Sequence, residues 1–400
     1  MRFSHKYLFI ILIICFAGCK KPYDPPAISN SGSYLVVEGV IKNGPDSTIF
    51  KLSRTVNLNS QITANPVLGA VLTIESDQNS TYPLTEIGKG NYTVVGLALD
   101  NTHKYRLRIK TGDSEYLSDF VPVVNAPPVD TVSYDIKADG LQINVSTHDL
   151  ASNSRYYRWD FQETWIFHSF YQSGYVSNGD TVIERNFATN EIYQCWGNDA
   201  STVIVLGSSA KLTQNVISNN PTTFIPKTSE KLGSKYSILV RQYALTPDAY
   251  TFWQNLKTNT EQLGSIFDAE PSQLNGNIHS TTNPAEAVIG YLSAGAVTSK
   301  RIFISNQQLP AWSPTLPYTN CVLDTLYLQF KPPGATVFVN QEDQYFNYNK
   351  GAGTNALIPV GAIIIIPKFG PEITIGHSGS SRECVDCTLR GTNKQPAFWK

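Results

Sequence analysis

The chain has 400 residues, of which 41% are hydrophobic and 16% are charged. At about 150 residues per domain, this length allows two or three domains with real cores. The formal net charge is −1, so no long-range field draws the protein to nucleic acid, which we do not expect as a partner. The 27 Gly and 23 Pro residues and the single Met favour strands and turns over helical bundles, and predict a mainly β protein.

Residues 1–18 have the features of a lipoprotein signal peptide. A basic start precedes an apolar stretch over 7–16, which is shorter than the roughly 20 residues needed to span a bilayer as a helix. The stretch ends in Phe16-Ala17-Gly18-Cys19, which resembles the lipobox of bacterial lipoproteins. We therefore expect lipidation at Cys19 and attachment of the protein to a membrane through this lipid anchor. Residues 19–31 are expected to form a proline-stiffened tether.

Residues 32–124 are predicted to form an N-terminal β-sandwich. Short β-branched runs bounded by Gly, Asn and Pro indicate antiparallel strands, as in 35–41 and 48–52. About seven such strands fit one immunoglobulin-like or prealbumin-like sandwich. The paired prolines of Asn125–Pro128 cannot continue a strand ladder, and they predict a rigid hinge.

Residues 129–245 are predicted to form a second β-sandwich. Its most aromatic window places five rings at one parity: Tyr157, Trp159, Phe161, Trp165 and Phe167. Such a face is typical of the inside of a sandwich, although an exposed stripe would suit sugar rings or an apolar ligand. In the loop that follows, Tyr171 and Tyr175 are candidate ligand contacts, because loops present binding residues.

Residues 246–400 are predicted to form one inserted helix and a β-rich C-terminal region packed on the second sandwich. Thr246 suits the N-cap, Pro247 the first helical position and Gly264 the C-terminal end of the helix. The most apolar run after the signal peptide, Ala362–Ile366, is bracketed by prolines and is too short to span a membrane. It predicts a buried strand.

The cysteines predict a disulfide-stapled C-terminal region. Besides Cys19, four remain after cleavage: Cys195, Cys321, Cys384 and Cys387. Outside the cytoplasm an even set favours disulfides, with three connectivities open. We expect Cys321 to pair with one of the two C-terminal cysteines. The alternatives are a zinc site that adds His377 to the last three, and a redox Cys-x-x-Cys pair.

Signatures of catalysis are missing from the sequence. It holds no phosphate loop, calcium loop or nucleophile elbow, and its one glycine-rich run of the dinucleotide type lacks a following helix signal. We therefore expect a non-enzymatic protein without a cofactor. The alternative is a hydrolase or metal-dependent module whose site is assembled from residues distant in sequence.

Several segments in this order resemble a Bacteroidota lipoprotein family catalogued as domain of unknown function 4249. They are Cys19, Leu35–Gly39, Cys195-Trp196, Leu245–Tyr250 and the tail from Cys384 to Trp399. The resemblance implies a lipoprotein anchored in the outer membrane, often encoded beside a TonB-dependent receptor, and assigns no reaction or site residue. The expected role is an accessory partner of such a receptor in solute uptake or envelope assembly. Both the periplasmic and the surface face of the membrane are open as its location.

Overall fold

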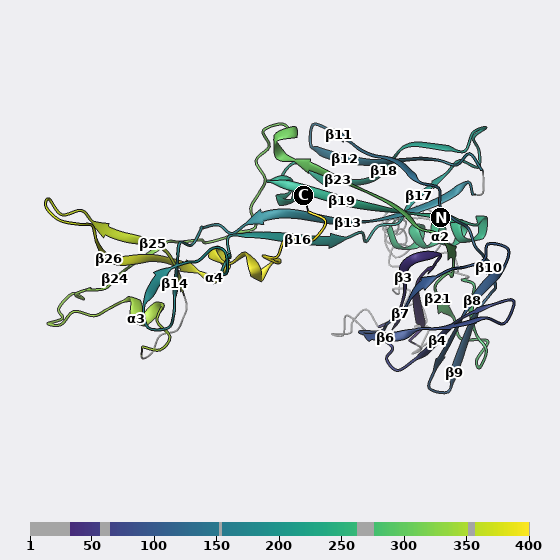
Figure 1. Ribbon diagram of the computed structural model, residues 1–400, viewed down its shortest axis with the longest axis horizontal. Coiled ribbons are helices and arrows are strands. Elements are labelled where there is room, and N and C mark those ends of the chain that lie inside the picture. The colour runs from purple at the N-terminus through teal and green to yellow at the C-terminus, as the bar shows by residue number, and fades with distance from the viewer. Residues whose placement is uncertain (1–32, 57–64, 152–153, 262–275, 351–356, 400) are drawn as a thin grey trace, which may run out of the picture.

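The computed structural model describes residues 33–56, 65–151, 154–261, 276–350 and 357–399. Two β-sandwiches lie together at one end of an elongated molecule, and an arm extends from the second sandwich (Figure 1). Most strand pairs are antiparallel and helices are few in these ranges, which confirms the mainly β prediction. In the same ranges, no helix has the length and apolar character needed to cross a bilayer.

The first sandwich packs two sheets face to face around an apolar core. One sheet has the order β21 (Val288–Ile289), β1 (Leu35–Gly39), β3 (Gly44–Arg54), β7 (Asn91–Leu97), β6 (Thr85–Gly88). The other has the order β20 (Ile278–Ser280), β9 (Ser114–Ser118), β8 (Lys104–Thr111), β4 (Val71–Ser76), β5 (Thr81–Pro83), with β10 (Val121–Pro122) beside β8. A further short pair joins β2 (Ile41–Lys42) to β22 (Ala294–Gly295).

Strand β8 shows how alternation builds this sandwich. Leu107 and Ile109 are fully buried in the core, whereas Arg106 and Arg108 point to the outer face and bind the carboxylate of Glu75 on β4. Partial burial alone would raise the pKa of Glu75, but the hydrogen bonds and charges of the two arginines outweigh it and hold this pKa below its usual value. A period of two therefore separates an apolar face from an ion-paired face on one strand.

Residues 278–295 complete the first sandwich and do not belong to the C-terminal region packed on the second one, where they are predicted from the sequence. Strand β21 pairs in parallel with β1, and β20 pairs antiparallel with β9. Ile278 and Leu292 are buried in the core of the first sandwich. The physical reason is that β1 and β9 would otherwise be bare sheet edges, which proteins cover.

The second sandwich is built from a three-stranded and a larger sheet. The first is β11 (Val129–Ile136), β12 (Gly140–His148), β18 (Val216–Pro226). The second is β16 (Gln194–Ala200), β13 (Tyr156–His168), β19 (Lys235–Leu245), β23 (Thr298–Ser305), with β17 (Val205–Ser208) beside β13; short 3-10 turns lie at η1 (Glu230–Leu232) and η2 (Asn306–Gln308).

The aromatic parity of β13 marks the inner face of this sandwich, as predicted. Tyr157, Trp159 and Phe161 are at most 4% exposed and lie in the second core. Trp165 packs partly buried against the same core, and Phe167 belongs to a small cluster with Cys195 at the base of the arm. Among the alternate residues of β13, Arg158 and Asp160 face the junction of the two sandwiches.

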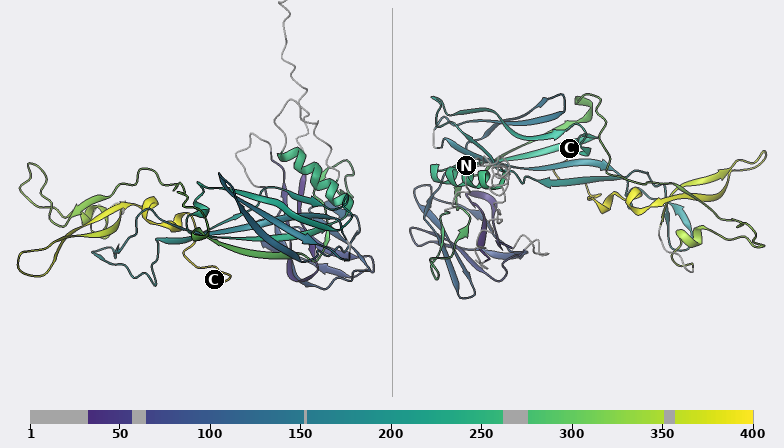
Figure 2. Two further views of the ribbon diagram at one scale, coloured as in Figure 1. Left: turned by 90° about the horizontal axis from the view of Figure 1, so that it is seen from above. Right: turned by 180° about the vertical axis from the view of Figure 1, so that it is seen from behind.

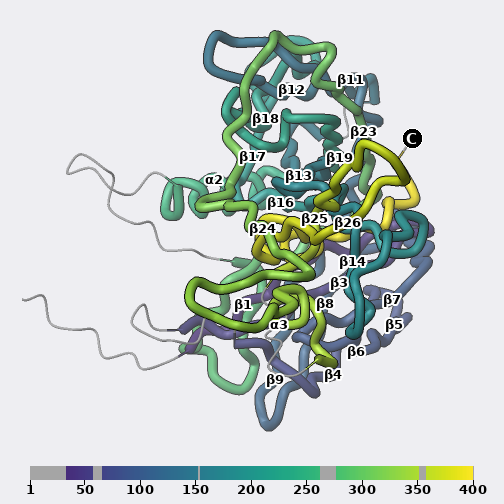
Figure 3. The backbone as a smooth tube through the Cα atoms, turned by 90° about the vertical axis from the view of Figure 1, so that its left-hand side faces the viewer, coloured from purple at the N-terminus to yellow at the C-terminus, as the bar shows by residue number. Residues whose placement is uncertain are grey.

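Helix α2 (Pro247–Glu261) lies at that junction, with the second sandwich above it and the first below it (Figure 3). The hydroxyl of Thr246 accepts a hydrogen bond from the Ala249 N–H at 3.2 Å, which confirms the predicted N-cap. The predicted end at Gly264 lies outside the described residues. The rings of Tyr250 and Phe252 lie 5.0 and 5.3 Å from those of Tyr156 and Tyr291, so the helix contacts both sandwiches.

The chain crosses from the first sandwich to the second at residues 123–128 and again at 294–298, and these two crossings are hydrogen-bonded to each other. The N–H groups of Val124 and Ala126 donate to the carbonyls of Ala294 and Ala296 at 2.8 and 3.0 Å. The predicted proline hinge is therefore one half of a double connection.

Gln242 fastens this connection to the second core. Its side chain is fully buried and accepts from Trp159 Nε1 at 2.8 Å. Its Nε2 donates to the Pro127 carbonyl at 2.8 Å and to the Thr147 hydroxyl at 3.0 Å. One amide thus links β13, β12 and the hinge.

The variant Gln242→Leu should lower the free energy of unfolding by about 2–4 kcal/mol, because it leaves the buried indole N–H of Trp159 without an acceptor. Urea unfolding followed by tryptophan fluorescence measures this change. The control Gln162→Leu removes a part-exposed amide on β13 and should change stability by no more than about 0.5 kcal/mol. Equal costs for the two variants would contradict the assigned role of Gln242.

Candidate functional site

The arm consists of two stretches of chain, residues 169–193 and, as far as the structure describes it, residues 313–350 with 357–389. The first leaves the second sandwich at the end of β13 and returns at β16; it carries the hairpin β14 (Tyr175–Ser177) and β15 (Val182–Glu184). The second carries the sheet β24 (Asp324–Tyr327), β26 (Ile373–Ser381), β25 (Leu357–Ile365), with α3 (Glu342–Tyr345), α4 (Arg382–Val385) and η3 (Cys387–Leu389). Figure 2 shows this arm projecting well away from the sandwiches.

Two disulfides tie the arm together, and all four predicted cysteines take part. Cys195 on β16 binds Cys387 across 192 residues of sequence, and Cys321 binds Cys384 across 63. Cys321 therefore pairs with a C-terminal cysteine, as expected. Because Cys321, Cys384 and Cys387 are all bonded through sulfur, they offer no thiolate for the alternative zinc or redox site.

The C-terminal tail returns from the arm to the second sandwich. The backbones of Trp196 and Thr392 exchange hydrogen bonds at 2.8 and 3.1 Å. The ring of Trp399 lies 6.4 Å from Trp196 and 5.5 Å from Phe303. The base of the arm is thus held by a disulfide and by an aromatic cluster on the sandwich.

The two loop tyrosines predicted as ligand contacts lie inside the arm. The Tyr171 hydroxyl donates to the Cys321 carbonyl at 3.2 Å, and the Tyr171 N–H donates to the Cys384 carbonyl at 3.0 Å. Tyr175 begins β14, and its ring lies 4.7 Å from that of His377. The structure brings these residues together in a packing role, and their predicted ligand contact stays a prediction.

Buried polar groups fix the packing of the arm. The guanidinium of Arg185 is 7% exposed and donates to the Ser173 hydroxyl and the Tyr175 carbonyl at 2.9 and 2.8 Å. Burial lowers the pKa of Arg185. His377 Nδ1 lies 2.7 Å from a Glu342 carboxylate oxygen, with both side chains buried. These contacts join the hairpin, α3 and β26 into one unit.

The arm ends in an exposed apolar tip, which we define as residues 328–339 and 364–373. Consecutive strand residues point to opposite faces. Ile364 and Ile365 are 46% and 49% exposed, so neither face of the β25–β26 hairpin is covered at its end. Beyond them, Ile366 is 71% and Phe369 is 87% exposed.

The second loop of the tip adds a similar surface. The backbones of Phe330 and Val339 exchange hydrogen bonds at 2.8 Å, which closes this loop as a small hairpin. Val337 and Phe338 are more than 60% exposed at its end, and the ammonium group of Lys331 lies 5.9 Å from the Phe338 ring. Both loops form the free end of the arm in Figure 1.

The prediction of a buried strand at Ala362–Ile366 is therefore wrong in its burial. Most of the run does lie in β25, but its exposure rises toward Ile366. The core of the arm ends before the hairpin does, and sequence alone does not show where a core ends. The signals that pointed to the tip were Pro367 and Lys368, which suit the end of an exposed strand.

Cys19, the predicted lipidation site, lies outside the described residues. Within the described ranges, no group of three or more His, Cys, Asp or Glu side chains is arranged to hold a metal ion.

Comparison with known proteins shows a family and a solved structure to which the chain is similar. A family profile described as domain of unknown function (DUF4249) matches residues 20–301. Among solved structures, the chain is similar to the Yersinia pseudotuberculosis adhesin InvE at 12% identity and a TM-score of 0.15, over 87% of this chain and 97% of that one. No curated protein matches the chain.

Replacing both cysteines of the first disulfide, Cys195→Ser with Cys387→Ser, should lower the free energy of unfolding by about 2–5 kcal/mol. Urea unfolding without reductant measures the loss. The matched control, Cys321→Ser with Cys384→Ser, opens a loop of 63 rather than 192 residues and should cost about 1 kcal/mol less by loop-closure entropy. A larger cost for the control would show that the first disulfide does not hold the arm.

Proposed function

The chain belongs to the DUF4249 family, and from this premise we propose that it is a non-enzymatic outer-membrane lipoprotein that docks on a TonB-dependent receptor through the tip of its arm. The matched region, residues 20–301, holds the first sandwich and the second one up to the middle of β23. The C-terminal stretch of the arm, with the tip, follows it in sequence. In this proposal the sandwiches are the body of the protein and the arm is its contact with the receptor.

The exposed tip is the observation that supports this proposal. Soluble proteins rarely leave a contiguous group of large apolar side chains in water unless it contacts another molecule. Ile366 and Phe369 stand at the end of one loop, and Phe338 stands at the end of the other. Covering one such side chain on a partner contributes about 1.5–3 kcal/mol, so a few of them suffice as the centre of an interface.

A protein surface suits the tip better than the interior of a bilayer. In the connecting loop 366–372, which the structure describes, no peptide group makes a backbone hydrogen bond outside the strand ladder. Hydrocarbon would leave these groups unsatisfied, at a cost of several kcal/mol each. A receptor can supply donors and acceptors for them. We therefore assign the tip to a protein partner in the membrane.

The anchor and the location are further parts of the same proposal. The signal-like start and the Phe16–Cys19 segment support lipidation at Cys19. Two disulfides between distant cysteines agree with an oxidising compartment outside the cytoplasm. The lipid would keep the protein in the plane of the membrane, where a receptor is met at high effective concentration.

The variant Ile366→Asp with Phe369→Asp should reduce capture of the receptor at least about tenfold, since it places charges where apolar groups are desolvated. The measurement is an affinity pull-down of tagged, full-length protein from gently solubilised native membranes, with the captured receptor quantified against the bait. Wild type should recover one TonB-dependent receptor at near-equal amount.

The matched control is Leu150→Asp, which charges a leucine on the second sandwich that is 92% exposed and should leave capture unchanged. Cys19→Ala separates anchoring from docking: this form should leave the membrane fraction but still bind the solubilised receptor. Recovery of wild type alone would refute the proposed partner. Equal capture by the tip variant and by Leu150→Asp would refute the tip as the contact.

A further inference from the structure

A cleft of about 680 Å³ opens between the two sandwiches, far from the arm. Strand β1 and residues near Ile289 form one wall, strands β13 and β19 form the other, and α2 closes one side. Its volume lies within the range of small-molecule sites, roughly 300–1,000 Å³, and such sites are frequent between domains. The cleft is therefore of a size to hold one organic ligand.

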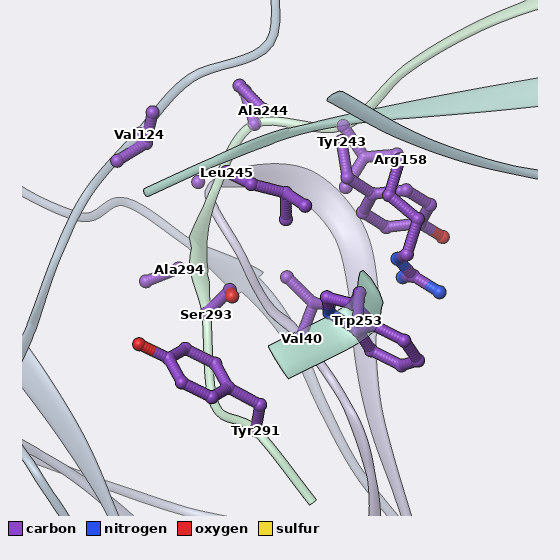
Figure 4. A pocket seen from close by; sticks show the side chains of 13 residues that line it. Val40, Val124, Arg158, Tyr243, Ala244, Leu245, Trp253, Tyr291, Ser293 and Ala294 are labelled. Atoms are coloured by element: carbon purple, nitrogen blue, oxygen red, sulfur yellow. The ribbon is translucent and has the colours of Figure 1, made fainter. Parts of the chain in front are cut away.

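Arg158 on β13 stands in this cleft without an acidic partner. Its guanidinium carbon lies 4.3 Å from the ring centroids of both Tyr243 on β19 and Trp253 on α2. Figure 4 shows the guanidinium beside these two rings. Its Nε is buried and has no hydrogen-bond acceptor in the described part of the chain. The rings hold the charge in place but accept none of its N–H groups in strong hydrogen bonds.

The nearby carboxylate of Asp160 is already engaged. One oxygen accepts from Arg241 Nε, and the other accepts from the Tyr243 hydroxyl at 2.7 Å. Burial, helped by the charge of Asp160, raises the pKa of Tyr243, so this phenol stays protonated and keeps donating. Asp160 is thus committed to a neighbouring pair, and Arg158 keeps its free charge.

The cleft carries positive charge in a chain that is close to neutral. Its charged lining residues are Lys42, Lys51, Arg158 and Arg241 against Glu38 and Asp160, two more cations than carboxylates. Lys51 faces Glu38 at 3.7 Å, and Arg241 is paired with Asp160. In the described residues this leaves Arg158 and Lys42 as the cations of the cleft without an ion-pair partner.

The remaining lining is largely apolar and aromatic. Phe252 and Leu256 come from α2, while Val36 and Val40 come from the first sandwich. A ligand that fits both parts of the cleft carries one anionic group and an apolar body. A planar carboxylate matches the fork of a guanidinium, which the two rings have already oriented.

We propose that this cleft binds a small organic carboxylate, with its carboxylate on Arg158 and its apolar body against α2 and β1. The site is independent of the arm and its tip, because none of the residues that line it belongs to the arm. Lys42 adds long-range attraction, which is weakened by salt.

Isothermal titration calorimetry on the full chain with Cys19→Ala tests the site. The probes are indole-3-acetate, 4-phenylbutyrate and octanoate, each paired with its neutral amide. We expect at least one acid to bind about tenfold or more tightly than its amide, which is the contribution of a charge-assisted bidentate contact. Arg158→Met should reduce this acid-to-amide ratio to about one, whereas a purely structural role of Arg158 would weaken both ligands alike.

Lys42→Met should weaken acid binding about two- to threefold at low salt. The control is Lys137→Met, which removes an exposed lysine on the second sandwich and should leave acid binding unchanged. Far-UV circular dichroism checks that the variants fold. If Arg158→Met does not fold, the acid-to-amide ratio of the wild type still tests the proposal. The assignment is overturned if no acid binds better than its amide up to about 10 mM. It is also overturned if Arg158→Met keeps the ratio, or if phenyl phosphate binds about tenfold more tightly than every acid.

Discussion

Two crossings of the chain between the sandwiches, hydrogen-bonded to each other, determine how the sandwiches sit relative to one another. A single proline linker would leave two sandwiches free to rotate, since interfaces between domains of one chain are usually modest. Here the stretch at Val124–Ala126 is hydrogen-bonded to the stretch at Ala294–Ala296. The two backbones approach so closely that a side chain at Gly295 would lie 1.9 Å from the Val124 carbonyl oxygen. Glycine at this position is therefore a steric requirement.

Because this hydrogen-bonded connection holds the two sandwiches together, it sets the shape of the cleft between them. Helix α2 packs between the sandwiches, and its Trp253 covers a face of the Arg158 guanidinium. At the other end of the same sheet, Cys195–Cys387 and the packing of Trp399 hold the arm. Strand β13 runs from the cleft toward the base of the arm, and the tip lies beyond it on the separate sheet β24–β26–β25.

Local patterns predicted the parts of this protein that depend on local physics. The parity of Tyr157, Trp159 and Phe161 predicted an inner sandwich face, and Thr246 with Pro247 predicted the start of α2. Cysteine count and compartment predicted disulfides, although the choice of Cys384 over Cys387 for Cys321 depends on the three-dimensional path of the tail. Sequence patterns are sufficient where neighbours along the chain decide the outcome.

The candidate sites required contacts between distant segments, and sequence did not predict them. The alternation along β13 identified Arg158 and Asp160 as polar residues on one face of the strand. Their contacts, Trp253 and Arg241, come from other elements, α2 and β19. The exposure of Ile366 depends on where the core of the arm ends. The return of residues 278–295 to the first sandwich depends on the edges that β1 and β9 leave open.

That return also orders the folding of the chain. Leu35 pairs with Val288, so the first sandwich cannot close its sheets until a segment some 250 residues later is available. The second sandwich lies almost entirely between these two points in sequence. Its own last strand, β23, follows them, so both sandwiches become complete only when residues 278–305 are available. Until then the edges of β1 and β9 are bare, and a bare strand edge invites pairing with another chain.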